Sequence, residues 1–181
     1  MEIFDLLLSE SFDADLFGRP AHVGRGLAVR ELTGSPADER AFAAALAGDE
    51  TYKGYLHRAE LFEEFRALDL AERDRERAVE LEPDYGDPNN ELAWMYVEHT
   101  PTPERLRQAV ELARRALAHS GDTPVRSNYL DTLGWAQFKL GNTGEALPHL
   151  ERAVAINPYH VLVRLHHRTV LDASAPPAAT G

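Results

Sequence analysis

The stretch that decides the fold is YLDTLGWAQFKLGNTGEALPHLERAVAINP, residues 129–158. Two helix-length segments meet at Gly141, and glycine is the residue that most often follows the end of a helix. Pro158 cannot continue a helix, so it marks the end of the second segment. Gly134 and Ala146 are small, which allows the two helices to cross closely. This stretch therefore predicts a pair of antiparallel helices joined by a short loop.

The same arrangement occurs twice more upstream. Small first-helix residues recur at Ala59, Ala93 and Gly134, at spacings of 34 and 41 residues. The second interval is longer because residues 99–103 and 121–125 carry extra loop. No segment alternates apolar and polar residues long enough to indicate a sheet. The sequence predicts helices over residues 53–66, 69–82, 89–99, 103–119, 127–140, 143–156 and 159–172.

This unit resembles the tetratricopeptide repeat (TPR), a helix pair of 34 residues with small residues at the helix crossings. Leu133 and Gly134 match its Leu-Gly pair, and four further matches lie in the second helix and at its end: Ala146, Leu150, Ala153 and Pro158. The resemblance covers residues 52–158. It implies an all-α fold, a TPR-type α-solenoid of antiparallel helix pairs with a C-terminal capping helix.

Some residues depart from the repeat pattern. The first copy has Arg58 where leucine is usual, and Arg75 stands at a large apolar position. The third copy has Gln137 in place of the usual tyrosine. The first copy is therefore the least regular of the three.

Three parts of the chain follow from these patterns. Residues 1–50 match no repeat well and are expected to form a degenerate helical N-terminal cap. Residues 51–172 are expected to hold three TPR units plus the capping helix. Residues 173–181 are small and rich in alanine and proline, which predicts a disordered tail.

Charge and composition limit the classes of partner. The chain has 30 acidic and 19 basic residues, and its net charge is -11. This field repels phosphate backbones, so we expect no nucleic acid partner and instead a basic or apolar one. The chain has no cysteine, no signal-peptide pattern and no apolar run long enough for a membrane span. A cytoplasmic protein without a membrane partner is expected.

The residues show no catalytic constellation, so we expect no enzyme, no cofactor and no metal site. His160, His166 and His167 lie in the last segment, but they lack the spacing of zinc-binding histidine pairs. Solvated or capping histidines are the favoured interpretation. The glycine-rich stretch 18–26 lacks the Gly-Lys-Ser/Thr ending of a phosphate-binding loop.

The resemblance also implies a binding face, because first-helix residues line the concave groove of TPR proteins. The partner-binding residues that it implies here are Leu56, Glu60, Glu63, Glu64, Asn90, Trp94, Val97, Glu98, Asn128, Asp131, Trp135 and Phe138. Both tryptophans of the chain fall on this face, where large aromatic side chains are typical binding hot spots. The alternative, that Trp94 and Trp135 pack between repeats, stays open at this point.

The function implied is a protein–protein interaction scaffold that binds a peptide or protein segment in the groove. The alternative is a structural self-association module, a homodimer formed through the C-terminal helix at Leu162 and Leu165. Some TPR proteins grip a chaperone's C-terminal carboxylate, but Leu56 and Glu60 stand at the matching positions, so that clamp is not supported.

Overall fold

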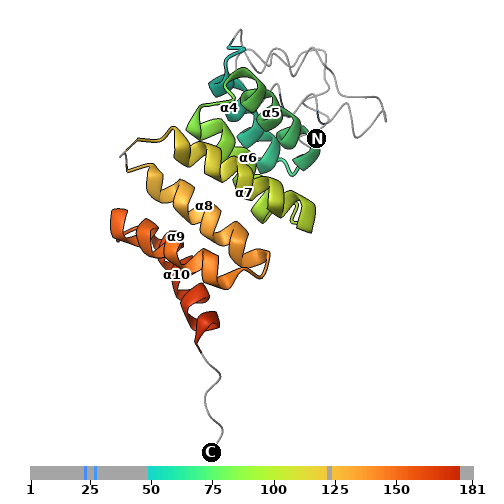
Figure 1. Cartoon of the computed structure of the whole chain (residues 1–181). Coiled ribbons are helices and arrows are strands. Elements are labelled where there is room, and N and C mark those ends of the chain that lie inside the picture. The colour runs from blue at the N-terminus through green and yellow to red at the C-terminus, as the bar shows by residue number, and fades with distance from the viewer. Residues whose placement is uncertain (1–22, 24–26, 28–48, 122–123, 176–181) are drawn as a thin grey trace, which may run out of the picture. The chain divides into compact units, whose positions relative to one another are not determined.

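The computed structural model describes residues 23, 27, 49–121 and 124–175. Within these residues the longer elements are seven α-helices, and no strand is present (Figure 1). The expected N-terminal cap, residues 1–50, lies almost wholly outside the described residues, as do residues 176–181 of the expected tail. The helices are α4 (Tyr52–Glu64), α5 (Leu68–Leu81), α6 (Gly86–Glu98), α7 (Pro103–Ala118), α8 (Arg126–Lys139), α9 (Thr143–Ile156) and α10 (Val161–Ser174).

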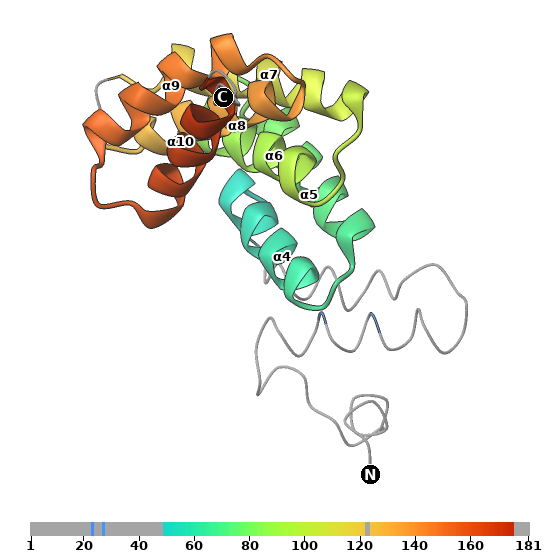
Figure 2. The same cartoon turned by 90° about the horizontal axis from the view of Figure 1, so that it is seen from below.

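The chain divides into two compact units, Met1–Leu81 and Glu82–Gly181. In the first unit α4 packs on α5. In the second unit α6 packs on α7 and α8 on α9, while α7 also contacts α8. Helix α10 packs on α9 and α8, which Figure 2 shows from below. The all-α helix-pair architecture expected from the sequence is confirmed.

The helix limits agree with the expected segments to within three residues. Helix α6 begins at Gly86, earlier than expected, because Pro88 lies in its first turn, where a helix needs no backbone N–H. Helix α10 begins later, at Val161, since His160 caps it: the His160 side chain accepts a hydrogen bond from the Val163 N–H at 3.4 Å. Helix α10 also continues two residues beyond the expected limit, to Ser174.

The close crossing of α8 and α9 is confirmed. Ala146 and Leu150 have no accessible surface. A β-carbon added at Gly134 would stand 2.7 Å from Leu150 Cγ and 3.1 Å from the Ala146 carbonyl oxygen. After the crossing, Gly141 has a φ of +86°, a conformation that strongly favours glycine. These residues hold the α8–α9 pair at its observed separation.

Buried ion pairs explain the departures of the first copy. Arg58 donates from Nε and Nη2 to the two carboxylate oxygens of Asp74, at 2.6 and 2.7 Å. Arg75 pairs with Glu63 through two similar contacts, at 2.9 and 3.0 Å. Charged residues replace the usual apolar contacts between α4 and α5. Each buried arginine therefore needs a carboxylate partner that neutralises its charge.

No helix among the described residues is long and apolar enough to cross a membrane.

Candidate functional site

Aromatic side chains from α6, α8 and α10 meet in the second unit. The indole of Trp135 on α8 stacks on the imidazole of His166 on α10, with ring centroids 4.1 Å apart and planes 12° apart. Phe138 stacks on Trp135 at 5.2 Å, and Trp94 of α6 lies 6.0 Å from His166. We call these four residues the aromatic cluster. It joins residues that are 72 positions apart in the chain (94 to 166).

Polar contacts hold Trp135 in the aromatic cluster. Its indole N–H donates to Glu98 Oε1 at 2.7 Å. The same oxygen accepts from Lys139 Nζ at 2.9 Å, and Lys139 also donates to the Val97 carbonyl at 2.8 Å. The Lys139 ammonium stands 5.5 Å from the Trp135 ring centroid, within cation–π range. Trp135 is therefore fixed by α6 on one side and by α10 on the other.

Two opposing effects act on the carboxyl of Glu98. Partial burial alone would raise its pKa, but the hydrogen bonds from Lys139 and Trp135, together with nearby positive charge, hold the pKa below its usual value. Glu98 is therefore ionised at neutral pH, which keeps it an acceptor for both donors.

A buried pair lies behind the aromatic rings. His166 Nδ1 is 3.0 and 2.9 Å from the two carboxylate oxygens of Asp131. The two side chains are 6% and 5% exposed, respectively. Because an ionised carboxylate can only accept, Nδ1 carries the proton of this contact. One expectation is corrected here, because His166 is neither solvated nor a capping residue. Asp131, named from the sequence among the partner-binding residues, is buried with it.

The remaining expected binding residues divide by exposure. Those open to solvent are Glu60, Glu64, Glu98 and Asn128, and those half-buried are Leu56, Glu63, Trp94, Trp135 and Phe138. Three are buried: Asn90, Val97 and Asp131. Val97 has no accessible surface, so it supports the fold and cannot contact a partner.

The two tryptophans have different surroundings. Trp135 packs against the core cluster of Ala146, Leu150 and Val170, so it matches the alternative of packing between repeats. Trp94 is half-buried and lies at the edge of the aromatic cluster. The aromatic contribution of α10 was missed from the sequence, because the spacing of His166 does not reveal that its helix lies against α8.

One face of α6 carries mainly hydrogen-bond acceptors. At 3.6 residues per turn, five positions share one side of the helix: Asp87, Asn90, Glu91, Trp94 and Glu98. We call these five residues the acceptor stripe. Helix α6 contains no lysine or arginine, and three of the five stripe residues are acidic, of which Glu98 is paired with Lys139 of α8. Asp87 already accepts a hydrogen bond from the Tyr129 hydroxyl, and burial and this bond together raise the pKa of Tyr129.

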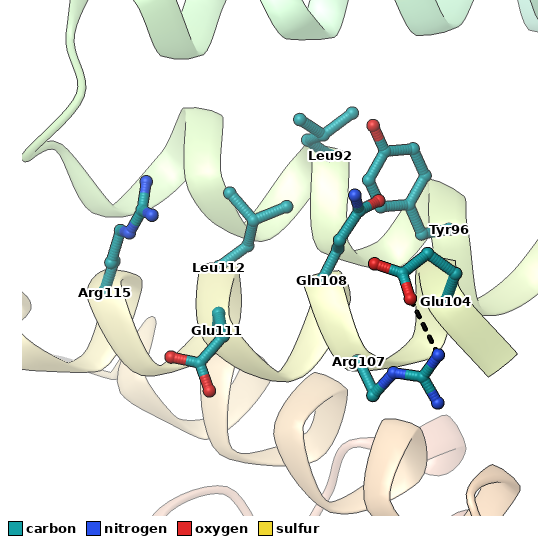
Figure 3. Close-up of a pocket in the computed structure, with 8 residues that line it drawn as sticks. All are labelled: Leu92, Tyr96, Glu104, Arg107, Gln108, Glu111, Leu112 and Arg115. Carbon is teal, nitrogen blue, oxygen red and sulfur yellow. Dashed lines mark hydrogen bonds and ion pairs between the residues drawn. The ribbon is translucent and has the colours of Figure 1, made fainter.

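A separate recess lies between α6 and α7 (Figure 3). Its volume is about 440 Å³, and Leu92, Tyr96 and Leu112 give it an apolar floor. Charged and polar side chains of α7 form its rim: Glu104, Arg107, Gln108, Glu111 and Arg115. Since Leu92 and Tyr96 stand about half a helical turn from the acceptor stripe, the recess opens on the opposite side of α6.

Across residues 49–121 and 124–175, no group of three or more histidine, aspartate or glutamate side chains is placed to hold a metal ion.

Consecutive helix pairs that bring their first helices to one face define a helical-repeat protein of the solenoid class. A family model described as "Tetratricopeptide repeat" matches residues 29–180 of this chain. The chain therefore belongs to the tetratricopeptide repeat family. Members of this family generally mediate protein–protein interaction, and the repeat is typically a non-catalytic scaffold.

Solved structures share the fold at low sequence identity. The structure of PilF from Pseudomonas aeruginosa is 19% identical with a TM-score of 0.61, covering 86% of this chain and 68% of that chain. Two crystal structures of MamA are 14% and 15% identical, with TM-scores of 0.57 and 0.58. They cover 75% and 85% of this chain, and 80% and 81% of the MamA chains. No curated protein sequence matches the chain.

Proposed function

We propose that this chain is an interaction scaffold that binds a peptide or protein segment on the face formed by its first helices. The observation that carries the proposal is the half-exposed Trp94, which lies at the edge of the aromatic cluster and within the acceptor stripe. Rigid aromatic side chains beside polar groups are typical hot spots of protein interfaces. The carboxylates of the acceptor stripe and the net charge of -11 favour a partner with basic and apolar character.

Affinity capture with matched variants tests this proposal. The chain is immobilised, and captured proteins are quantified by mass spectrometry for the parent, Trp94→Ala and Leu171→Ala. Leu171 is an exposed apolar residue of α10 outside the acceptor stripe, so it serves as the control. We expect a partner that the parent and Leu171→Ala retain and that Trp94→Ala loses by roughly thirtyfold in affinity, the effect of about 2 kcal/mol at a hot spot.

Equal capture by all three proteins would place the binding surface elsewhere. Circular dichroism of Trp94→Ala must show unchanged helical content, because a loss of fold would also remove binding. Trp135 is less suitable for this test, since it connects α6, α8 and α10 and its removal would disturb all three helices.

The second candidate function is self-association through the C-terminal helix. Five large apolar side chains are exposed within ten residues at this end of the chain: Ile156, Tyr159, Val161, Leu162 and Leu165. Val161 is 78% exposed and Leu165 is 58% exposed. Large apolar side chains exposed this close together in the chain favour an interaction site.

Sedimentation velocity over a range of protein concentrations tests the second candidate. A concentration-dependent dimer that Leu162→Gln and Leu165→Gln abolish would support self-association, with Leu171→Gln as the control. A monomer at every concentration would rule it out.

A further inference from the structure

The rim of the recess between α6 and α7 carries charged and polar side chains in a regular order. Four of them, all exposed, follow one another along α7 at spacings of four, three and four residues: Glu104, Gln108, Glu111 and Arg115. Side chains at this spacing share one side of a helix, as they do along the seam on which a second helix packs. We call these four residues the α7 seam. Figure 3 shows them lining the recess.

The α7 seam is complementary to itself when its direction is reversed. In an antiparallel pair of identical helices, the first seam residue faces the last one of the other helix, and the second faces the third. Glu104 of each copy then faces Arg115 of the other, and Gln108 of each copy faces Glu111. A two-fold axis at the centre of the seam produces both contacts twice. A parallel pair would place identical residues opposite each other, so the charges would repel. The order of the residues therefore selects the antiparallel arrangement.

The charged residues of the α7 seam can take part in these contacts. The Arg115 guanidinium has no hydrogen bond or ion pair with the residues that the structure describes. Glu104 accepts one hydrogen bond from Arg107 at 2.7 Å. Glu111 accepts one from Arg114 at 2.9 Å. All four side chains of these two pairs are more than half exposed, so the pairs are weak, and each carboxylate has a second oxygen for a further donor.

We propose that a second copy of this chain docks on the α7 seam in the antiparallel direction and forms a two-fold symmetric dimer. Two Glu104–Arg115 ion pairs stand at the ends of this contact, and two Gln108–Glu111 hydrogen bonds lie at its centre. The self-complementary charge order identifies the occupant, because a second copy carries the matching order on its own α7.

The floor of the recess adds an apolar contact to the dimer. Leu92, Tyr96 and Leu112 form this floor, and a second helix seated over the recess covers them with the aliphatic parts of its Gln108 and Arg115 side chains. The recess opens on the opposite side of α6 from the acceptor stripe, so the dimer leaves both binding faces open. The proposal thus goes beyond the proposed function. A dimer with two binding faces gains avidity for a partner that carries two segments.

Charge reversal at either end of the α7 seam tests the dimer by sedimentation velocity of the full chain. Glu104→Arg places arginine opposite arginine at both ends of the contact, and Arg115→Glu places glutamate opposite glutamate. Each variant should raise the dissociation constant of the dimer by at least about tenfold, because like charges then face each other. Glu151→Arg makes the same charge change at an exposed site of α9, so it is the control and should dimerise like the parent.

A mixture of the two variants gives the most specific test. In a pair formed by one Glu104→Arg chain and one Arg115→Glu chain, both ends of the contact again join opposite charges. An equimolar mixture should therefore contain heterodimers at a concentration at which each variant alone is a monomer. A chain that carries both substitutions should also recover the dimer. This recovery separates the loss of the contact from a loss of fold, because a misfolded variant would not regain the dimer on mixing.

Three results would overturn the proposal: a parent that is monomeric over the whole concentration range, a mixture of the two variants that remains monomeric, or a dimer that both single variants retain. If Leu162→Gln or Leu165→Gln abolishes the parent dimer while both α7 variants keep it, self-association belongs to α10. Assemblies larger than a dimer would also contradict a closed two-fold contact. Sedimentation is measured without the macromolecular partner. A failure here with Trp94-dependent capture intact would therefore leave the proposed function standing.

Discussion

Ala146 lies where α8 and α9 cross, and its side chain has no accessible surface. Replacing it with leucine adds three carbon atoms in a place where the α8 backbone at Gly134 leaves no room. We expect Ala146→Leu to lower the free energy of unfolding by roughly 1–3 kcal/mol, the usual cost of overpacking a core. Urea unfolding measures the change. Ala155→Leu makes the same substitution at an exposed site of α9 and should unfold like the parent.

The charge state of His149 affects stability near neutral pH. Its Nδ1 is enclosed without a hydrogen-bond partner in the described part of the chain. Burial, and then the positive charges of Arg152 and Arg114, lower the pKa of His149 below its ordinary value of 6.5. The unfolded chain therefore takes up this proton more readily than the folded chain. Stability from this residue is complete above about pH 6.5 and is lost as the pH falls towards the lowered pKa.

Replacing His149 isolates this effect. Between about pH 7.5 and about pH 5.5, the unfolding midpoint of His149→Leu should fall less than that of the parent. His119→Gln removes an exposed histidine at the end of α7 and is the control. If the unfolding midpoints of the parent and His149→Leu change in parallel with pH, the pKa of His149 is the same in the folded and unfolded chains.

Helices α4 and α5 depend on charge where other repeats use apolar contacts. Arg58 and Asp74 are 6% and 1% exposed, so each neutralises a charge that water cannot reach. Asp74→Leu alone should cost on the order of 3 kcal/mol, because it leaves the guanidinium buried without this carboxylate. Adding Arg58→Leu should recover most of the loss, since two leucines restore the apolar contact that the repeat normally makes. A double-mutant cycle by urea unfolding measures the coupling.

A double variant no more stable than Asp74→Leu would contradict this account of the α4–α5 contact. It would show that leucine cannot fill the volume that the two charged side chains occupy.

The elements themselves were largely predictable from the sequence, and the contacts between charged residues were not. Small residues in both segments of a helix pair allow the helices to cross closely, so Gly134 and Ala146 located the crossing. Arg58 and Arg75 were visible as departures, but the pattern did not identify Asp74 and Glu63 as their partners. Two charges at apolar positions of one repeat would have been a signal to search the facing helix for carboxylates.

The candidate site was partly predictable for a similar reason. Repeat register placed Trp94 and Trp135 at equivalent positions, and the structure has them on neighbouring first helices. The register does not give the position of a helix that follows the last complete repeat. The contact of His166 with Asp131 and both tryptophans therefore required the structure.

At the scale of the whole molecule, 30 acidic residues against 19 basic ones create self-repulsion in any compact state. Exposed ion pairs within single helices, such as Arg77–Glu80 and Arg168–Asp172, oppose this repulsion. Exposed pairs of this kind contribute about 0–1 kcal/mol each. An imbalance of -11 should therefore outweigh them, and salt should stabilise the fold.

We expect the urea midpoint to rise when NaCl increases from about 10 mM to about 150 mM, as the screening length falls from about 30 Å to about 8 Å. The double variant Glu60→Gln, Glu64→Gln removes two exposed charges of α4 that stand one turn apart. It should have a higher midpoint than the parent at low salt and a smaller response to added salt. If the midpoint of the parent falls with salt instead, attractive ion pairs dominate its electrostatics. The acidic surface would then stabilise the fold through local pairs rather than oppose it through net charge.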